Sequence, residues 1–308
     1  MLRPRRLQPG ARIAVVAPAS PLPRESFDAG VAELARLGFA PVWDESVFAR
    51  QRYVSGSPDL RADALRAALA DPNIDAVIAV RGGYGSAQLL PLLDANEVIA
   101  AGKPIIGYSD ITALLSFVTI QCGMVAFHGT MLDGRLAVGE SAYDRDTFVR
   151  SLTVAEPLGE YQAPGLTTVV AGEAAGPVLG GTVTQLLASL GTPWAFDPPR
   201  GYVLLFDEVG ERPYRLDRMV TQLRQSRLLA RASAVVIGEL PKCDEPGSEG
   251  SAYDVVRELF AGFHGPVVLG FPAGHTAGRQ LTVPLGVRAR VIADQHTPRV
   301  VIEESAVS

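Results

Sequence analysis

Apolar residues in the first half of the chain form short runs that alternate with stretches where they recur every three or four residues. The runs IAVVA, APVW, DAVIAV and KPII predict strands at 13–17, 40–43, 75–80 and 103–106. Helical spacing predicts a helix that closes at Gly38, a helix that begins at Ser57, and helices over 86–101 and 111–118. This alternation predicts a parallel sheet with helices on both faces. Such sheets carry their active sites at the carboxyl ends of the strands.

The second half follows a stretch from about Thr153 to Gly176 that is rich in proline and glycine. We interpret it as the crossing between two domains, because 308 residues exceed one ordinary domain. Later patterns predict helices at 182–190, 214–229 and 251–261, strands at 202–206, 234–240 and 266–271, and β-like segments at 281–293 and 299–303. We therefore expect an α/β domain at 1–155, a linker at 156–175 and a smaller, mixed, strand-rich domain at 176–308.

Composition narrows the class of protein. A net charge of −5 and a pI near 5.5 give no electrostatic footprint for nucleic acid, so a small partner is expected instead. Cys122 and Cys243 are too few for a disulfide framework or a regularly spaced zinc site, which favours the reducing cytosol. No apolar stretch approaches the ~18 residues of a membrane span, and the run at 13–17 is shorter than a signal-peptide core. We expect a cytoplasmic protein without membrane contact.

Ser109 stands where a predicted strand gives way to a helix, in the stretch KPIIGYSDITALL. A serine on a sharp strand-to-helix turn exposes its hydroxyl above the sheet, and the N–H groups that follow point at whatever the hydroxyl attacks. This placement is typical of a nucleophile with half an oxyanion hole. Serine beside aspartate at a helix start is also an ordinary N-cap, so both interpretations stay open here.

The segment RGGYGS, residues 81–86, follows the strand immediately before the serine turn. Glycines let a backbone approach a ligand closely and donate N–H groups to it. The spacing matches neither a dinucleotide fingerprint nor a phosphate-binding loop, so a nucleotide site is not indicated. A simple glycine-rich turn is the alternative.

The chain has four histidines as candidates for a general base. His275 lies in a glycine- and proline-rich loop beyond a buried strand, which suits a base, although loop histidines are common. His128 ends an apolar strand and either lines the cleft or belongs to the core. His264 and His296 lie in polar turns and are expected to be solvated.

Two carboxylates end the apolar strand YVLLF, namely Asp207 and Glu208. A carboxylate there must find a partner, and orienting an imidazole is one reason for its presence. The alternative is an ion-pair cluster with Arg212, Arg215 and Arg218.

Together these segments resemble the LD-carboxypeptidase family of serine peptidases, also called S66, which includes enzymes that give self-immunity to microcin C. The matching stretches, in family order, include VAPASP, RGGYGS, IIGYSDITALL, HGTML, GPVLGGTVTQLLASLGTP, DEVGERPYRLDRMVTQL and GFPAGHT. The resemblance implies a flavodoxin-like or amidotransferase-like N-terminal domain, a smaller strand-rich C-terminal domain and a homodimer. It implies no metal and no cofactor.

The resemblance also implies a triad with Ser109 as nucleophile and His275 as base. The family usually reads Glu-Asp where this chain reads Asp207-Glu208. Ungapped register through Val-Gly-Glu selects Asp207 as the acid, whereas residue type selects Glu208. Side chains alternate across a strand, so only one of the two is expected to face His275.

The oxyanion hole implied by the family is made by the N–H groups of Gly83 and Asp110. Arg81, Gly82 and Tyr84 are candidate substrate contacts, although Arg81 has pairing with Asp110 as an alternative role.

The implied reaction is hydrolysis of an amide between an L-centre and a terminal D-amino acid, as when D-alanine leaves a murein tetrapeptide. A peptide-nucleotide of the microcin C type is the alternative substrate. A non-catalytic small-peptide-binding protein is the alternative from another class.

Overall fold

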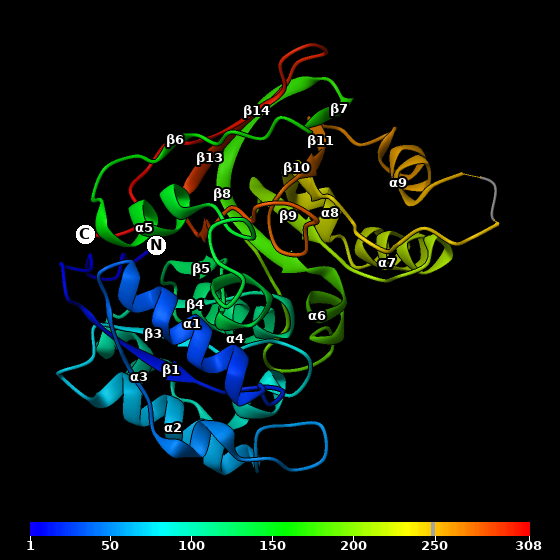
Figure 1. The fold of residues 1–308 in the computed structure, drawn as a ribbon. Coiled ribbons are helices and arrows are strands. Elements are labelled where there is room, and N and C mark those ends of the chain that lie inside the picture. Colours follow the sequence, from blue (N-terminus) through cyan, green and yellow to red (C-terminus); the bar gives the residue numbers. More distant parts are fainter. Residues whose placement is uncertain (248–249) are drawn as a thin grey trace.

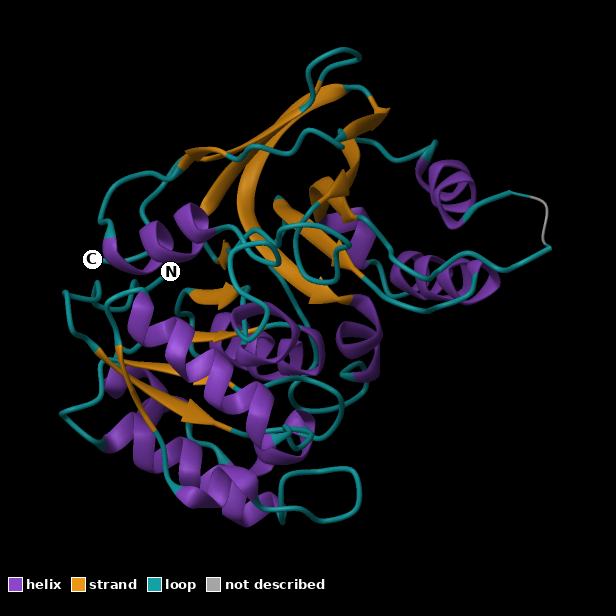
Figure 2. Cartoon of the chain, in the orientation of Figure 1, coloured by secondary structure: helices purple, strands orange, loops and turns teal. Residues whose placement is uncertain are grey.

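Two β-sheets, one in each half of the molecule, organise the residues that the computed structural model describes, 1–247 and 250–308 (Figure 2). The first sheet has the order β12-β5-β4-β3-β1-β2. Its strands are β1 (Arg12–Val16), β2 (Ala40–Val42), β3 (Ala76–Ala79), β4 (Ile105–Gly107), β5 (Ala126–His128) and β12 (Val283–Leu285). Every neighbouring pair is parallel except β12 with β5. The predicted parallel N-terminal sheet is therefore confirmed.

The second sheet has eight strands in the order β6-β14-β13-β8-β9-β10-β11-β7. They are β6 (Gly159–Glu160), β7 (Thr167–Val170), β8 (Gly172–Thr182), β9 (Tyr202–Asp207), β10 (Ala232–Gly238), β11 (Val267–Phe271), β13 (Arg288–Ala293) and β14 (Arg299–Ile302). The four central strands, β8 to β11, run parallel, and the outer strands are antiparallel to their neighbours. This confirms the mixed, strand-rich second half.

Helices cover both faces of the first sheet and one face of the second. The α-helices are α1 (Arg24–Arg36), α2 (Pro58–Ala70), α3 (Ala95–Ala101), α4 (Thr112–Ser116), α5 (Arg145–Thr153), α6 (Val183–Ala188), α7 (Pro213–Gln225), α8 (Leu228–Arg231) and α9 (Ala252–Phe260). The 3₁₀ segments are η1 (Glu45–Phe48), η2 (Ser86–Leu92) and η3 (Ser109–Ile111), and the π segments are η4 (Phe117–Gln121) and η5 (Leu132–Leu136). In Figure 1, α1 lies on one side of the first sheet, and α2 and α3 lie on the other. None of the helices within the described part of the chain is long and apolar enough to cross a membrane.

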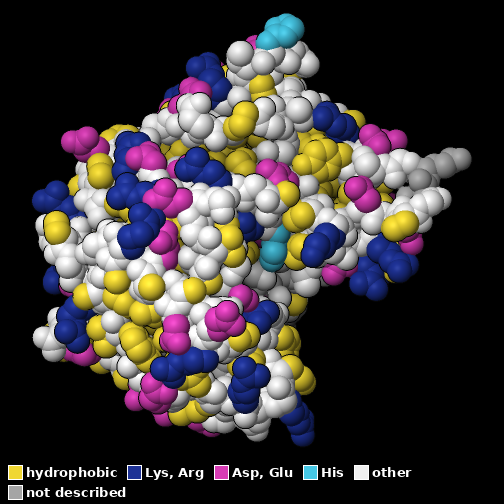
Figure 3. Space-filling model, viewed as in Figure 1, with side chains coloured by type: hydrophobic (Ala, Val, Ile, Leu, Met, Phe, Trp, Pro, Cys, Tyr) yellow, Lys and Arg dark blue, Asp and Glu magenta, His cyan; other side chains and the backbone are white. Residues whose placement is uncertain are grey.

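One apolar core runs through both halves. It includes Ile106 and Phe127 of the first sheet together with Val203, Val236 and Phe271 of the second. A separate cluster joins the opposite face of the second sheet to helices α6 to α9. Because interiors pack densely, a shared core fixes the two sheets against each other. The surface is hollowed where the two halves meet (Figure 3).

Several predicted elements differ from the observed ones. The helix expected over 86–101 is a 3₁₀ segment, η2, with Pro91 inside it, followed by a new helix, α3, that Asp94 caps. Proline removes a hydrogen-bond donor, which explains the break. The helix expected over 214–229 breaks at Arg227, which has a φ of +63°.

The C-terminal β-like segments also divide differently. Residues 281–293 hold two strands, and β12 leaves the second half to pair antiparallel with β5 of the first sheet. Strands β6 and β7 fall within 156–175, the expected linker, and pair with the second sheet through β14 and β11. This stretch therefore contributes ladder hydrogen bonds to that sheet, while the domain division at 155 and 176 stays a proposal.

Helix α2 shows how single residues fix these elements. The Ser57 hydroxyl accepts the Leu60 N–H and Pro58 fills the first helical position, an ordinary helix start. At the other end, the buried Lys103 ammonium donates to the carbonyls of Ala68, Leu69 and Asp71 at 3.0, 2.7 and 2.6 Å. A cation at this end satisfies carbonyls that the helix leaves unpaired and complements its dipole.

We expect Lys103→Met to lower the free energy of unfolding by roughly 1–3 kcal/mol, because it leaves buried carbonyls without donors. The measurement is urea denaturation of purified protein. Lys242, the only other lysine, is exposed and provides the matched control. Lys242→Met should change stability by less than about 0.5 kcal/mol. Equal denaturation midpoints for the two variants would contradict the capping role.

Candidate active site

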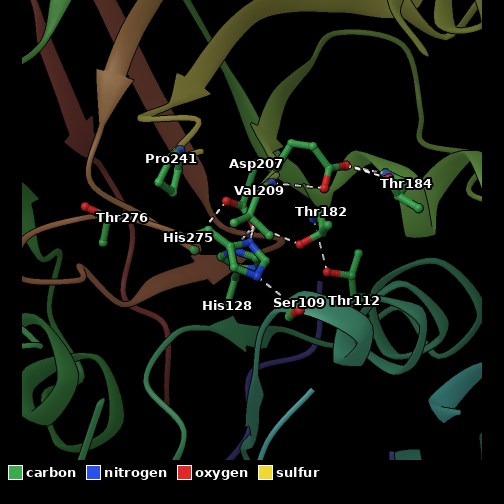
Figure 4. Close-up of polar contacts among 12 residues, drawn as sticks. Ser109, Thr112, His128, Thr182, Thr184, Asp207, Val209, Pro241, His275 and Thr276 are labelled. Atoms are coloured by element: carbon green, nitrogen blue, oxygen red, sulfur yellow. Dashed lines mark hydrogen bonds and ion pairs between the residues drawn. The ribbon is translucent and has the colours of Figure 1, made fainter. Parts of the chain in front are cut away.

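The carboxyl ends of strands from both sheets converge at the junction between the halves. Ser109 follows β4 of the first sheet, Asp207 is the last residue of β9, and the loop carrying His275 follows β11 (Figure 4). Parallel strands present their carboxyl ends at one edge, so two such edges face each other here. The site expected from strand order is therefore assembled from both halves.

Ser109 sits on a strained turn. Its φ is +62°, a left-handed conformation that costs a residue with a Cβ about 1–2 kcal/mol, whereas the preceding Tyr108 is extended. The Ser109 hydroxyl does not cap the helix that follows. Instead, the Asp110 carboxylate accepts the Ser86 N–H at 2.8 Å, and the Ser86 hydroxyl donates to the Asp110 carbonyl at 2.5 Å. The turn thus directs the Ser109 side chain toward the other half of the molecule.

The glycine-rich segment packs directly against this turn. A Cβ on Gly82 would lie 2.8 Å from the Ser109 Cβ and 3.1 Å from the Asp110 nitrogen. Gly83 has a φ of +99°, and a Cβ there would overlap the Ser20 side chain. Only glycine permits this approach, so 81–86 is more than a generic turn.

Three side chains form a hydrogen-bonded chain. His275 Nε2 lies 3.1 Å from Ser109 Oγ, and His275 Nδ1 lies 3.0 Å from Asp207 Oδ2. Asp207 is fully buried and also accepts the His275 backbone N–H at 2.7 Å and the Thr182 hydroxyl at 2.8 Å. A Cβ on Gly274 would overlap the Asp207 carboxyl group, so the loop can lie this close only with glycine there.

Strand alternation decides which carboxylate reaches His275. Along β9, Val203 and Leu205 face the shared core, whereas Leu204 and Phe206 face the helices. By this alternation, the Asp207 side chain lies on the same face as Val203 and Leu205 and points into the junction between the halves. The Glu208 side chain lies on the face of Leu204 and Phe206, toward the helices.

Glu208 is buried in a separate polar contact. It accepts the N–H and the hydroxyl of Thr184 at 2.9 and 2.7 Å. The arginines after it pair elsewhere, Arg212 with Glu245 and Arg215 with Glu211, so the ion-pair cluster considered for the two carboxylates is not observed in the described structure.

The electrostatics favour an Asp207 carboxylate facing a basic imidazole. Burial raises the pKa of Asp207, but the facing charge and hydrogen bonds of His275 outweigh it and hold the pKa below its ordinary value. Burial lowers the pKa of His275. The charge and hydrogen bond of Asp207 outweigh this effect, so the pKa of His275 lies above its ordinary value. Burial raises the pKa of Glu208 despite its hydrogen bonds to Thr184.

The other histidines do not enter this chain. His128 is fully buried, with Nε2 3.9 Å from Asp207 Oδ2, and burial lowers its pKa to about 4. It therefore belongs to the buried wall behind the site and is neutral near pH 7. His264 and His296 are exposed, as expected.

The predicted substrate contacts surround the serine turn. Arg81 Nε lies 3.4 Å from the Asp133 carboxylate, so the alternative pairing with Asp110 is wrong. Tyr84 is half exposed, and its ring meets Tyr53 edge-on at 5.4 Å between centroids. The Tyr84 N–H donates to Ser20 Oγ at 3.1 Å.

Sequence reasoning missed two groups around the triad. Thr182 lies in the stretch GPVLGGTVTQLLASLGTP, which matches the family, but the sequence alone assigned it no role. Arg135 donates its hydrogen bonds to backbone carbonyls, three of them in the His275 loop, and such contacts leave no residue signature in a sequence. Within the described residues, no group of three or more His, Cys, Asp or Glu side chains is placed to hold a metal ion.

Comparison with known proteins adds to this geometry. Family models described as the LD-carboxypeptidase N-terminal and C-terminal domains match residues 13–129 and 175–291. The chain belongs to the S66 peptidase family.

Relatives of this S66 member include a Streptomyces coelicolor protein whose name leaves its carboxypeptidase activity unproven. It is 40% identical over 96% of this chain and 95% of its own length. A murein tetrapeptide carboxypeptidase from Pseudomonas aeruginosa is 30% identical over 86% of this chain and 88% of its own. The structure of MccF with glutamyl sulfamoyl guanosine superposes with a TM-score of 0.91 at 26% identity and full coverage of both chains.

We expect the imidazole of His275 to titrate above its ordinary value of about 6.5, because Asp207 stabilises the imidazolium. Asp207→Asn removes that charge and should move the midpoint downward. Histidine-selective NMR measures both, with the signal assigned by His275→Gln. His128 should stay neutral from pH 5 to 8 and serves as the internal control. A His275 midpoint unchanged by Asp207→Asn would contradict this electrostatic account.

Proposed function

We propose that this S66 peptidase is a serine carboxypeptidase that hydrolyses the amide between an L-centre and a C-terminal D-amino acid. The observation that carries the proposal is the Ser109–His275–Asp207 chain, with contacts of 3.1 and 3.0 Å, on a strained strand-to-helix turn. The murein tetrapeptide carboxypeptidase relatives support the substrate class.

In this mechanism, the Nδ1–H of His275 donates to Asp207, which leaves Nε2 free to accept the Ser109 proton. Ser109 Oγ attacks the peptide carbonyl. The N–H groups of Gly83 and Asp110 bind the resulting oxyanion, a role supported by the close packing of Gly82 against the turn.

His275 then returns the proton to the leaving amine, and the terminal amino acid departs. Water, activated by the same imidazole, hydrolyses the acyl-enzyme and restores the Ser109 hydroxyl. Asp207 stays ionised throughout and stabilises the imidazolium that forms twice in each cycle.

A carboxypeptidase must also bind a free carboxylate. Arg81 is the proposed partner. It follows β3 and precedes Gly82, which packs against Ser109, and its side chain is partly exposed. Gly82 and Tyr84 complete the proposed substrate contacts. A cytoplasmic location and a homodimeric assembly belong to the same proposal.

One observation favours a second substrate. Tyr84 of the glycine segment and Tyr53, 50% and 59% exposed, form an aromatic pair, and such surfaces stack nucleobases. A peptide-nucleotide is therefore the second candidate, and the structure of MccF with aspartyl sulfamoyl adenosine supports it. The assembled triad argues against a purely peptide-binding role.

We expect Ser109→Ala to keep the fold and lower kcat by roughly 10⁴-fold, because it removes the nucleophile. Asp207→Asn should lower kcat by a similar factor, because it removes the charge that orients His275. Glu208→Gln is the matched control, since Glu208 binds Thr184 instead. Release of D-alanine from a murein tetrapeptide provides the assay. A crippled Glu208→Gln beside an active Asp207→Asn would reverse the assignment of the acid.

We expect kcat/KM for a tetrapeptide ending in L-Lys-D-Ala to exceed that for L-Lys-L-Ala by at least ~100-fold, because inverting the leaving residue misplaces the carbonyl. The D-Ala amide should also be a poor substrate, because it lacks the terminal charge. Product masses on one peptide scaffold measure all three. Equal rates for the two stereoisomers would defeat the L,D assignment. Preferential cleavage of an aminoacyl sulfamoyl adenosine would favour the second candidate.

A further inference from the structure

Arg135 is a buried arginine that the mechanism above does not use. It lies in η5, in the first half of the chain, and is 8% exposed. Its guanidinium reaches across the junction to the loop that carries His275. Burying a guanidinium is unfavourable unless its donors are satisfied, so the groups it binds show what it holds in place.

Four backbone carbonyls satisfy it. Nη2 donates to the carbonyls of Thr276 and Gly274 at 3.0 and 3.4 Å. Nη1 donates to those of Gly278 and Ala142 at 3.2 and 3.0 Å. Three of the four belong to the loop 274–278, and two of these flank His275 directly. The loop is therefore held by the planar fork of one side chain from the other half.

Other backbone groups of the loop bind side chains of the second half, among them the Ala277 N–H, which donates to Glu239 Oε2 at 2.9 Å. The His275 N–H is bound by Asp207, and the Gly274 carbonyl also accepts Gln280 Nε2 at 2.7 Å. Each of these partners comes from the second half of the chain. Arg135 binds the backbone of this loop from the half that carries the nucleophile.

The same guanidinium lies near the serine turn. Arg135 Cζ is 5.9 Å from the centroid of the Tyr108 ring, and that ring meets the His275 ring edge-on at 5.2 Å. Tyr108 precedes Ser109 in the chain. One cation thus contacts the residue before the proposed nucleophile and the loop of the proposed base.

We propose that Arg135 is a positioning residue that sets the placement of His275 against Ser109, an inference that rests on the proposed function. Arginine suits this role and lysine does not. The guanidinium presents its donors in a rigid plane that reaches two pairs of carbonyls, whereas an ammonium offers three donors from one point.

Arg135 also acts on the charge of His275. Asp207 and Glu208, at the end of β9, favour the imidazolium, and the Arg135 cation opposes it. Two further neighbours, Tyr108 and His128, are uncharged near pH 7, because burial raises the pKa of Tyr108 and lowers that of His128 to about 4. The Glu239 carboxylate binds the Ala277 N–H of the same loop and keeps its charge when Arg135 is replaced. Removing the Arg135 charge should therefore raise the pKa of His275.

The test compares Arg135→Met with Arg135→Lys. We expect Arg135→Met to lower kcat by roughly 100-fold, as for other small displacements of a catalytic group, with little change in KM. The acidic limb of kcat/KM should move to higher pH. Arg135→Lys keeps the charge and so should keep the wild-type midpoint, but it should recover kcat only in part. Arg279→Met is the matched control, because Arg279 lies beyond the same loop and pairs at the surface with Asp144.

Two readouts make the result independent of substrate. One is the NMR midpoint of His275, and the other is the rate at which a fluorophosphonate labels Ser109. A folded Arg135→Met protein with wild-type labelling and midpoint overturns the proposal. A uniform loss of activity in both variants with no shift of the midpoint also overturns it, because it shows a merely structural role. Failure of the proposed function gives a different result. The wild-type protein would then cleave no peptide, or Ser109→Ala would cleave normally. The NMR midpoint of His275 would still respond to Arg135→Met.

Discussion

The buried carboxylate of Asp207 is the group on which the arrangement of the site depends. A charge without solvent contact is unfavourable unless its oxygens are bound, and here they accept a threonine hydroxyl from the end of β8 and two N–H groups of His275. These donors come from different segments of the second half, so the carboxylate is stable only when both are in place. The close approach also explains why position 274 is glycine. The orientation of the imidazole follows from neutralising this one charge.

The two halves then need each other for reasons of packing as well as chemistry. The nucleophile turn belongs to one parallel sheet and the acid and base to another, and a continuous apolar core fills the space behind them. A rigid junction suits a site whose parts must hold their spacing to within about 0.5 Å. Asp207 is buried beside Tyr108 and His128, so water screens its interaction with His275 only weakly, and these two neighbours carry no charge near neutral pH.

Much of this was predictable from sequence, and the remainder failed for identifiable reasons. The alternation of strands and helices fixed the class of fold, and Ser109, the glycine segment and His275 stand out because turns need particular residues at particular places. The choice between Asp207 and Glu208 could not be made, since alternation says that one of the two faces the site but not which face of β9 meets the core.

Arg135 was missed because it binds carbonyls that every residue possesses. The departure of β12 to the first sheet depends on long-range pairing that local pattern does not encode, and Pro91 and Arg227 broke helices that apolar spacing alone would have continued.

Strand β12 has a consequence for how the protein is made. It covers the β5 edge of the N-terminal sheet, yet it is synthesised long after β5 leaves the ribosome. Until then β5 presents unpaired N–H and C=O groups beside an apolar surface, which is a template for pairing with other chains. Truncated products would keep that open edge and are hazards for aggregation. Completion of the nascent chain is thus also the step that closes the first sheet against its neighbours in the cell.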